Sequence, residues 1–426
     1  MAIPLIIEFA FFAAYVALGV FAWGVLAWGI AKGRQRIDFL DRPPRDVPPT
    51  PLGPASVCVI VPARNEADCI VTCVRSLLAQ QGVALHVLVI DDRSTDATPK
   101  LLDALAAEDD RLLVLHKTTS PPAGWVGKTA ALHAGVAHLR SLGVEADWLV
   151  FVDADVTLEP SAVAKAVDAC RLRRFDLLTL LLRLAGEGFW ERLLIPLGGV
   201  TATTLYLAPF TNLDIGRIPA FANGQFIAVR RTAYEAVGGH EAVRQHLCED
   251  IALARLFQRN KLRPRVAWGG HVGQVRMYRG LSQTVRGFAR IFYGGSAGRP
   301  WRVLAGLGWL LLTVASLVAA LVWGVYRVRF PVVAFGGAGW LLAVVLHAAA
   351  VVAALALVYR HSRHPWWLAL AWPVGLVALA WVLLKALVSC VTGRAEWRGQ
   401  TYTGLYAEAT AADASGHVAA EIRSTV

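Results

Sequence analysis

The sequence predicts an α/β domain built on a mixed sheet, with one membrane-spanning helix before it and about three after it. Of the 426 residues, 56% are hydrophobic and only 17% are charged, which is too apolar for an ordinary soluble chain. Apolar strand and helix patterns alternate between residues 56 and 115. A further apolar strand pattern then ends at two carboxylates, Asp153 and Asp155.

The first apolar segment predicts an N-terminal transmembrane anchor over residues 1–37. It is uncharged from Phe9 to Ala31 and is followed by Lys32, Arg34 and Arg36. A basic flank marks the cytoplasmic end of a spanning helix. A cleaved signal peptide is the competing interpretation, but no basic region precedes the segment and its apolar run is too long.

Residues 38–55 contain six prolines and predict a stiff, extended linker. A globular domain is expected over residues 56–300, which is long enough for one sizeable core. No internal repeat is visible, and the domain is expected to face the cytoplasm.

Three later uncharged segments predict a C-terminal transmembrane region over residues 301–392. Each can cross roughly 30 Å of hydrocarbon. They run over Val303–Tyr326, Pro331–Tyr359 and Pro365–Leu384. Glycines in the second and a proline in the third leave a re-entrant segment open as an alternative, so the side reached by the polar tail 393–426 also stays open.

The net charge of +11 is scattered and comes mainly from arginine. No basic run interleaved with aromatic residues is present, so we expect no nucleic-acid partner. Anionic lipid headgroups and a diphosphate fit the charge better. The six cysteines contain no C-x-x-C pair and are interpreted as reduced packing residues, without disulfides or zinc.

The globular domain opens with a βαβαβ pattern. Strands are expected at 56–61, 85–90 and 112–115, and helices at 66–79 and 97–107. Such alternation builds a parallel sheet with right-handed crossovers, and its ligands bind across the carboxyl ends of the strands.

Polar clusters follow the first two strands. The first is Pro62-Ala63-Arg64-Asn65-Glu66, and the second begins with Asp91 and Asp92. The paired aspartates are placed to accept hydrogen bonds from a base or ribose. Ser94, Thr95 and Asp96 are better explained as caps of the next helix.

The Asp153-Ala-Asp155 pair stands at the end of the strand pattern that begins at Trp148. Two anions so close repel each other unless a cation lies between them, which predicts Mg²⁺ or Mn²⁺ carrying a diphosphate. A solvated turn after a strand is the alternative for this DxD motif taken alone.

Two further charged positions are candidates for chemistry. Glu249 and Asp250 open a helical pattern, where compensation of the helix dipole is the alternative role. Lys128 follows Gly124 and Gly127, which suit a backbone that approaches a ligand closely, although a solvated lysine at a helix start gives the same pattern.

These motifs together resemble family 2 glycosyltransferases of the GT-A fold. Val61-Pro-Ala-Arg-Asn-Glu66, Asp91-Asp-Arg-Ser-Thr-Asp96, Gly124-Trp-Val-Gly-Lys128, Asp153-Ala-Asp155 and Glu249-Asp250 occur in that family's order and spacing, over residues 56–293. Val275-Arg-Met-Tyr278 and Gly287-Phe-Ala-Arg290 most resemble the membrane-anchored enzymes that act on lipids. Ceramide glucosyltransferase-like, carotenoid-modifying and hopanoid-associated enzymes form that group.

The resemblance implies roles for individual residues. Donor binding, with uridine the expected nucleoside, falls to Pro62, Ala63, Arg64, Glu66, Asp91, Asp92, Lys128 and Asp153. Asp155 becomes the main metal ligand, supported by Asp153. Asp250, beside Glu249, becomes the general base for an incoming hydroxyl, which implies inversion at the anomeric carbon.

Other matches are looser. Asn223, Gly224 and Gln225 resemble a sugar and acceptor loop, although a polar turn before a strand gives the same pattern. The region of Arg286 and Arg290 corresponds to one where processive relatives carry Gln-x-x-Arg-Trp. Here Gly287 replaces the tryptophan, which argues against a polymer site. Arg276, Arg286 and Arg290 are candidates to clamp a diphosphate or to contact lipid headgroups.

Two segments are left with structural hypotheses. Leu193–Phe210 is apolar but broken by prolines and glycines, so we interpret it as an interfacial element that admits a membrane-dissolved acceptor. Residues 397–402, Trp-Arg-Gly-Gln-Thr-Tyr, resemble a tail motif of the lipid-modifying enzymes; if they lie in the cytoplasm, the expected count of four spans is wrong by one.

The sequence therefore predicts a metal-dependent, inverting hexosyltransferase that moves a sugar from a UDP-linked donor to a lipid hydroxyl. It is expected to be a multi-pass protein of a bacterial inner membrane. The alternatives are a processive polysaccharide synthase and a non-catalytic membrane scaffold that uses the same fold. Neither the sugar nor the lipid is specified.

Overall fold

The structure is a computed structural model that describes residues 2–42, 52–213, 218–330, 336–397 and 400–403. Half of the predicted linker and most of the tail lie outside these residues. The chain divides into two compact units. The first, called the membrane unit after the predicted spans it contains, comprises Met1–Arg42, Leu182–Ile218 and Val266–Thr392. The second, called the catalytic unit after the predicted catalytic residues it contains, comprises Pro43–Leu181, Pro219–Arg265 and Gly393–Val426.

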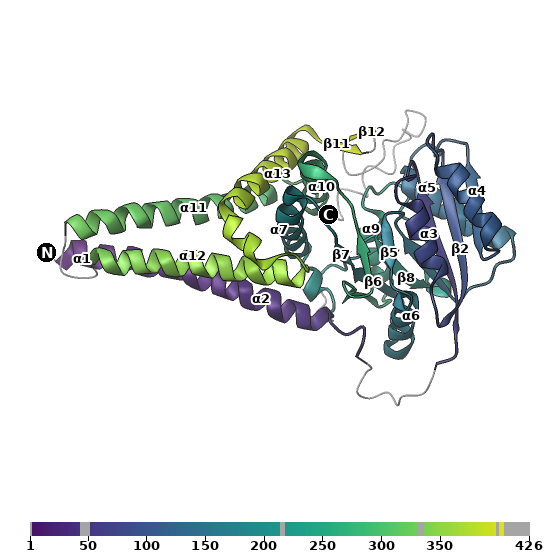
Figure 1. Cartoon of the computed structure of the whole chain (residues 1–426), viewed down its shortest axis with the longest axis horizontal. Coiled ribbons are helices and arrows are strands. Elements are labelled where there is room, and N and C mark those ends of the chain that lie inside the picture. The colour runs from purple at the N-terminus through teal and green to yellow at the C-terminus, as the bar shows by residue number, and fades with distance from the viewer. Residues whose placement is uncertain (1, 43–51, 214–217, 331–335, 398–399, 404–426) are drawn as a thin grey trace. The chain divides into compact units, whose positions relative to one another are not determined.

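A seven-stranded mixed sheet organises the catalytic unit, in the order β3-β2-β1-β4-β8-β6-β9 (Figure 1). Its strands are β1 (Ala55–Ala63), β2 (Val83–Asp92), β3 (Leu112–Lys117), β4 (Trp148–Val152), β6 (Leu177–Leu181), β8 (Phe226–Arg230) and β9 (Pro264–Trp268). The strands β1 to β4 pair in parallel, whereas β8 runs antiparallel to both β4 and β6. The predicted mixed α/β sheet is confirmed.

The helices of this unit are α3 (Ile70–Leu78), α4 (Thr98–Glu108), α5 (Gly127–Ser141), α6 (Ala162–Arg173), α8 (Arg231–Ala236) and α9 (Glu249–Arg259). One sheet face packs on α5 and α9 through a core that includes Ile60, Phe151 and Phe257. The approach of α5 is close, because a Cβ on Gly135 would lie 2.7 Å from the Ile90 side chain. This packing holds the first turns of α5 and α9 at the carboxyl edge of the sheet.

Helix α3 begins four residues later than the sequence pattern predicts. Asn65 adopts a left-handed φ of 54°, and its N–H donates to Ser94 Oγ at 2.9 Å. The Glu66 N–H donates to Thr98 Oγ1 at 2.9 Å. Residues after β1 are thus tied to the loop after β2 instead of entering the helix. Asp96 accepts from the Thr98 N–H at 3.0 Å, close to its predicted capping role.

Among the described residues, the membrane unit has four helical segments long and apolar enough to cross a bilayer: Ile6–Ile37, Pro300–Arg329, Gly336–His361 and Trp366–Thr392. The first is built from α1 (Ala2–Val16), a π-helical turn η1 (Ala17–Phe21) and α2 (Ala22–Ile37). The second and third are α11 and α12, and the fourth joins a 3-10 turn, η3 (Trp366–Ala371), to α13 (Trp372–Thr392). The expectation of one N-terminal and three C-terminal helices is confirmed.

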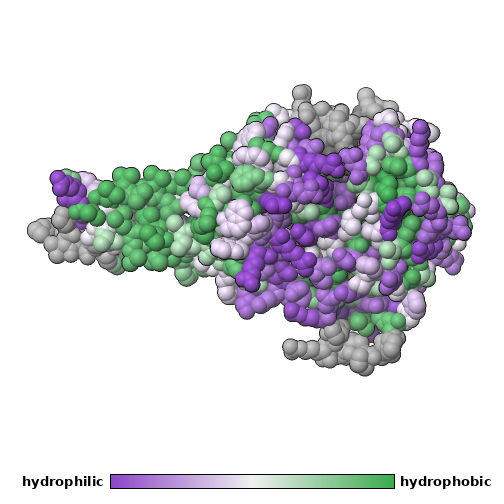
Figure 2. Space-filling view, viewed as in Figure 1, coloured by the Kyte–Doolittle hydropathy of each residue, from purple (hydrophilic) through white to green (hydrophobic). Residues whose placement is uncertain are grey.

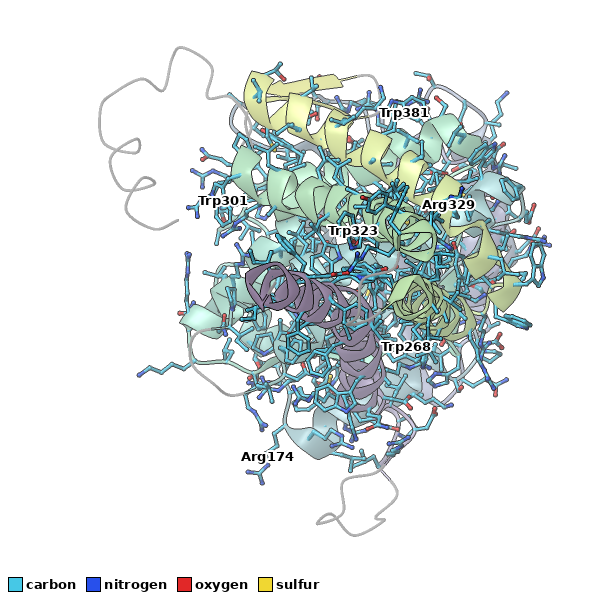
Figure 3. All side chains as sticks on the ribbon, turned by 90° about the vertical axis from the view of Figure 1, so that its left-hand side faces the viewer. Arg174, Trp268, Trp301, Trp323, Arg329 and Trp381 are labelled. Carbon is cyan, nitrogen blue, oxygen red and sulfur yellow. The ribbon has the colours of Figure 1, made fainter. Side chains whose placement is uncertain are left out.

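Apolar side chains cover the visible surface of α11 and α12 (Figure 2). Helix α11 carries Trp301 near its start and Arg329 at its end, and both are labelled in Figure 3. Inside the unit, Glu8 and Arg327 form a buried ion pair at 2.5 Å. The Trp340 indole also donates to Glu8, at 3.3 Å. These contacts fasten the first helix to the α11–α12 pair.

The interrupted segment Leu193–Phe210 lies mostly within one helix, α7 (Phe189–Leu205), despite Pro196. Helix α7 packs with α10 (Gly280–Gly295) and α13 in one apolar core. Gly198 permits this contact, because a Cβ there would lie 2.5 Å from the Phe288 ring. The glycines that weakened the sequence pattern therefore serve helix packing.

The remaining described elements are short. They are β5 (Val156–Leu158), β7 (Arg183–Leu184), β10 (Gly273–Val275), the turn η2 (Ala208–Phe210), β11 (Arg394–Trp397) and β12 (Gln400–Thr403). Strands β11 and β12 pair as an antiparallel hairpin. The predicted tail motif falls on this hairpin, but its residues 398 and 399 lie outside the described chain, so its role stays a prediction.

Candidate active site

Strand β4 delivers Asp153 to the carboxyl edge of the sheet. The Asp153 N–H donates to the Gln225 carbonyl at 3.4 Å, which joins the end of β4 to the start of its antiparallel neighbour β8. The carboxylate of Asp153 lies 2.7 Å from Lys128 Nζ, and its side chain is 31% exposed. Asp155 lies two residues on, half-buried in the turn before β5. The Lys128 ammonium group thus holds Asp153, while Asp153 and Asp155 both keep access to solvent.

Lys128 lies in the first turn of α5 and is surrounded by acidic groups. Its Nζ is 2.8 Å from Glu249 Oε1 as well as 2.7 Å from Asp153 Oδ1. Burial lowers the pKa of Lys128, but the charges of Asp153, Glu249 and Asp250 outweigh burial and raise that pKa above its usual value. The ammonium therefore stays charged and positions the carboxylates around it.

Asp250 lies in the first turn of α9 and is held by two backbone donors. Its Oδ2 accepts from the Gly224 N–H at 2.7 Å, and its Oδ1 accepts from the Ile251 N–H at 2.8 Å. Burial and the nearby charge of Glu249 raise the pKa of Asp250 to about 7, against the opposing effect of Lys128. A carboxylate with this pKa can take up a proton near neutral pH.

The loop between Asn223 and Gln225 is fixed by hydrogen bonds that its backbone N–H groups donate to side chains. The Asn223 N–H donates to Thr179 Oγ1 at 2.9 Å, and Asn223 Oδ1 accepts from the Gln225 N–H at 3.3 Å. Gly224 has no room for a side chain, because a Cβ would lie 2.8 Å from Lys128 Nζ and 3.3 Å from Asp250 Oδ2. The side chain of Gln225 is buried. The loop therefore positions Asp250, and its predicted contact with a sugar stays a prediction.

Asp91 and Asp92 end β2, which is two strands from β4 along the same edge, and both are buried. Asp91 Oδ2 lies 2.9 Å from His116 Nδ1, and this hydrogen bond raises the pKa of His116. Asp92 accepts from Arg93 at 2.9 and 3.0 Å. Lys117 lies 3.8 Å away from it. Both carboxylates are therefore anchored by basic side chains of the same edge.

The cluster after β1 lies at the same edge. Ala63 is in register with Asp91, and Pro62 lines a small pocket beside β4. Arg64 and Glu66 follow in the loop and are half-buried. The pocket is lined by Pro62, Lys128, Leu132, Phe151, Val152, Asp153, Gly224, Ile227, His240, Glu249 and Asp250. The structure thus gathers six of the residues predicted from sequence, namely Pro62, Lys128, Asp153, Gly224, Glu249 and Asp250.

His240 is a pocket residue that the sequence analysis missed. It is 2% exposed, and its Nδ1 lies 2.8 Å from the hydroxyl of Tyr234. Burial first, and then the charge of Lys128, lower the pKa of His240 to about 3. The ring is therefore a neutral wall of the pocket. The only sequence feature that marks it is the preceding Gly238-Gly239 pair, whose glycines both adopt positive φ.

The arginines proposed for the diphosphate lie in the membrane unit. Arg286 Nη1 donates to Ser282 Oγ at 2.7 Å on the exposed side of α10, and Arg290 follows on the same helix. Arg276 pairs with Glu187 at 2.8 Å. A role for these arginines in binding the donor stays a prediction.

Gly287, which replaces the expected tryptophan, has a physical explanation within the membrane unit. A Cβ at this position would lie 2.1 Å from the ring of Tyr278. Tyr278 therefore fills the space beside α10, and no larger residue fits at Gly287.

The carboxylate oxygens of Asp153 and Asp155 are suitable ligands for a divalent cation. Among the described residues, no group of three or more His, Cys, Asp or Glu side chains could enclose a metal. Mg²⁺ is usually held by one or two carboxylates together with substrate phosphates. Two accessible carboxylates at one strand end suit an ion that arrives with a diphosphate.

Comparison with known proteins gives a family match for this part of the chain. Residues 58–238 match the model of the family Glycosyl transferase family 2. The 4,4'-diaponeurosporenoate glycosyltransferase of Staphylococcus aureus strain MRSA252 is 28% identical over 267 residues, which are 62% of this chain and 68% of that protein. The protein of that name from strain USA300 is 27% identical over the same shares.

Solved structures are also similar. The mannosyltransferase PcManGT from Pyrobaculum calidifontis, in complex with GDP-Man and Mn²⁺, aligns with 90% of this chain and 98% of its own, at 19% identity and a TM-score of 0.46. TarS 1–349 of S. aureus, in complex with UDP-GlcNAc, aligns with 83% of this chain and 99% of its own, at 16% identity and a TM-score of 0.39.

Proposed function

We propose that the protein transfers a sugar from a nucleotide donor, UDP-linked, to a hydroxyl of a membrane lipid; the match of residues 58–238 to the model of Glycosyl transferase family 2 supports the transfer of a sugar. Two observations support the lipid acceptor. The part of the chain that the structure describes has four helices apolar enough to span a bilayer, and the relatives named above act, by their names, on diaponeurosporenoate.

The half-buried carboxylate of Asp250 is the observation that carries this proposal. It lies in the same pocket as Lys128 and Asp153, and two backbone N–H groups fix its orientation. A positioned base with a pKa near the working pH is what deprotonation of a hydroxyl requires. In this proposal Asp250 accepts the proton of the acceptor hydroxyl.

The reaction follows from this placement. As the acceptor oxygen bonds to the anomeric carbon, its proton passes to Asp250 and the bond to the nucleoside diphosphate breaks. Attack opposite the leaving group inverts the anomeric configuration. Lys128 holds Asp153 and Glu249 in place throughout, and the absence of a side chain at Gly224 leaves the space that Lys128 Nζ and Asp250 Oδ2 occupy.

Asp153 and Asp155 would hold Mg²⁺ or Mn²⁺, which when bound supplies positive charge to the departing diphosphate. Pro62, Ala63, Arg64, Glu66, Asp91 and Asp92 are proposed to bind the nucleoside. Arg286 and Arg290 are proposed to contact the diphosphate.

The proposed orientation places the catalytic unit in the cytoplasm of a bacterium. Lys32, Arg34 and Arg36 lie at the end of the first span that leads into this unit, and basic flanks mark the cytoplasmic side. Nucleotide sugars are then available to the pocket.

The proposal is tested with the full chain purified into lipid nanodiscs. We expect label from a panel of radiolabelled UDP-sugars to enter the organic-extractable lipid in the presence of Mn²⁺ or Mg²⁺. Chelation with EDTA is expected to abolish transfer, and readdition of the cation to restore it. Absence of cation-dependent turnover of any nucleotide sugar, with host lipid extract supplied, would contradict the proposal.

A further inference from the structure

A buried histidine lies in the turn between α12 and η3 of the membrane unit. His364 is 7% exposed. Its backbone N–H donates to the Tyr359 carbonyl at 2.8 Å, and the Arg363 N–H donates to the Arg360 carbonyl at 3.1 Å. Two such backbone hydrogen bonds are typical of a helix that ends with one left-handed residue, here Arg363 with a φ of 56°. The turn thereby fixes the imidazole inside the unit.

One ring nitrogen of His364 is left for a ligand. Nδ1 lies 2.9 Å from the Ser362 carbonyl and must donate to it. Within the described residues, the buried Nε2 has no hydrogen-bond partner. Buried polar groups without partners are uncommon and call for an unseen group.

The charges around this ring are positive. Arg183 on β7 and Arg192 on α7 both act electrostatically on the imidazole. The Nε of Arg183 is itself buried without a hydrogen-bond partner in the part of the chain that the structure describes. We call His364, Arg183 and Arg192 the basic cluster.

The nearest carboxylates in the sequence are already engaged elsewhere. Glu187 lies 2.8 Å from Arg276 and Glu191 lies 3.8 Å from it. Glu191 also accepts from the backbone N–H groups of Glu187 and Gly280, at 2.9 and 2.8 Å. These carboxylates therefore do not neutralise the basic cluster.

A hydrogen bond also ties the end of α12 to α7. The hydroxyl of Tyr359 donates to the Leu193 carbonyl at 2.8 Å, and both residues are buried. Tyr359 is also the residue whose carbonyl accepts from His364, and Leu193 follows Arg192 directly. The same tyrosine thus places His364 and Arg192 on neighbouring elements.

The position along the helices indicates the depth of the cluster. The turn separates two segments apolar enough to span a bilayer, Gly336–His361 and Trp366–Thr392. Trp366 and Trp367 follow it directly and are 60% and 55% exposed. Exposed tryptophans at the end of an apolar helix mark the level of the lipid headgroups.

We propose that His364, Arg183 and Arg192 bind the phosphate group of a membrane lipid at the water boundary. Arginine forks match phosphate oxygens in geometry and charge, and basic pockets between helices at this depth suit anionic headgroups. The charges of Arg183 and Arg192 disfavour protonation of the imidazole at Nε2. A bound phosphate would offset these charges, so that a protonated Nε2 could donate a hydrogen bond to the phosphate. This site goes beyond the proposed transfer reaction and does not rest on it.

Direct lipid binding tests the proposal independently of turnover. Native mass spectrometry of the full chain in detergent would compare dioctanoyl phosphatidic acid with dioctanoylglycerol, which lacks the phosphate. We expect the phosphorylated lipid to bind in preference, and Arg183→Gln/Arg192→Gln to weaken its binding roughly tenfold or more. Arg329→Gln removes the same charge from an exposed position at the far end of α11 (Figure 3), and should leave binding unchanged.

Arg192→Gln alone serves as a second variant, because Arg192 is exposed and its loss should not disturb folding. Thermal unfolding checks each variant. Equal binding of the two lipids, or full retention of phosphatidic acid by the folded double variant, would overturn the site. Displacement of the lipid by inorganic phosphate at equal concentration would overturn the assignment to a lipid, because it would indicate a site for the free anion.

Discussion

Two charged clusters of opposite composition lie in the two units of this protein. In the catalytic unit, the single cation of Lys128 is shared by Asp153, Glu249 and Asp250. In the membrane unit, the positive charges of Arg183 and Arg192 act on His364. The first cluster has carboxylates in excess and suits a divalent cation, whereas the second has cations in excess and suits an anion. Local charge imbalance thus indicates the sign of the group that each site is proposed to bind.

Removal of the central cation should break the first cluster with the largest effect. In Lys128→Met, three carboxylates would face one another without compensation. A buried charge that loses its partner destabilises a protein by about 3–5 kcal/mol, so we expect a lower denaturation midpoint and loss of transfer. Lys100→Met, which removes an exposed lysine on α4, is the control. An unchanged midpoint in Lys128→Met would show that the lysine does not organise the site.

Space at Gly224 is the next most sensitive feature. In Gly224→Ala the new Cβ would displace Lys128 Nζ or Asp250, and a shift of about 1 Å can cost roughly 100-fold in rate. Transfer of label to lipid measures this loss. Gly53→Ala is the control, because nothing lies within 4 Å of a Cβ there. Equal activity of both variants would contradict the packing described for the pocket.

The rate of sugar transfer should depend on pH through Asp250 in the catalytic cluster. Asp250 must be deprotonated to act as a base, and its pKa is raised to about 7. Transfer should therefore fall about tenfold for each pH unit below about 7 and level off above it. The rate with saturating donor, measured from pH 5 to 9, tests this. A flat profile down to pH 5 would exclude Asp250 as the group whose ionisation limits the reaction.

The smallest expected effect concerns the hydrogen bond that supports the basic cluster. Tyr359→Phe removes the hydroxyl that donates to the Leu193 carbonyl, and one such bond contributes about 1 kcal/mol. We expect a slightly lower unfolding temperature and weaker binding of phosphatidic acid, while sugar transfer to a soluble acceptor is unaffected. Unaltered lipid binding would show that the turn is held by other contacts.

Local patterns were enough to predict much of the fold and of the site. The β1 to β3 alternation, the strand end at Asp153 and the helix start at Asp250 each depend on neighbouring residues. The four apolar helices follow from composition alone. The partners of these groups depend instead on the order of strands in the sheet, so the hydrogen bond between Gly224 and Asp250, the role of Thr179 and the place of His240 could not be predicted.

The basic cluster shows the same limit more strongly. Arg183, Arg192 and His364 are far apart in sequence, and none belongs to a recognisable motif. Their proximity depends on packing between α7 and the end of α12, and on an arginine in the left-handed conformation at residue 363. A sequence pattern based on hydrophobic periodicity carries no information on either feature.

The most direct test of the catalytic cluster is single-turnover transfer by Asp250→Asn in nanodiscs, with donor affinity measured in parallel. The amide keeps the size of the side chain but cannot accept the proton, so we predict a loss of about 100- to 10,000-fold in transfer with donor affinity unchanged. Glu145→Gln, an exposed carboxylate elsewhere in the catalytic unit, should retain full activity. Transfer by Asp250→Asn at the wild-type rate would contradict the assignment of this residue as the base.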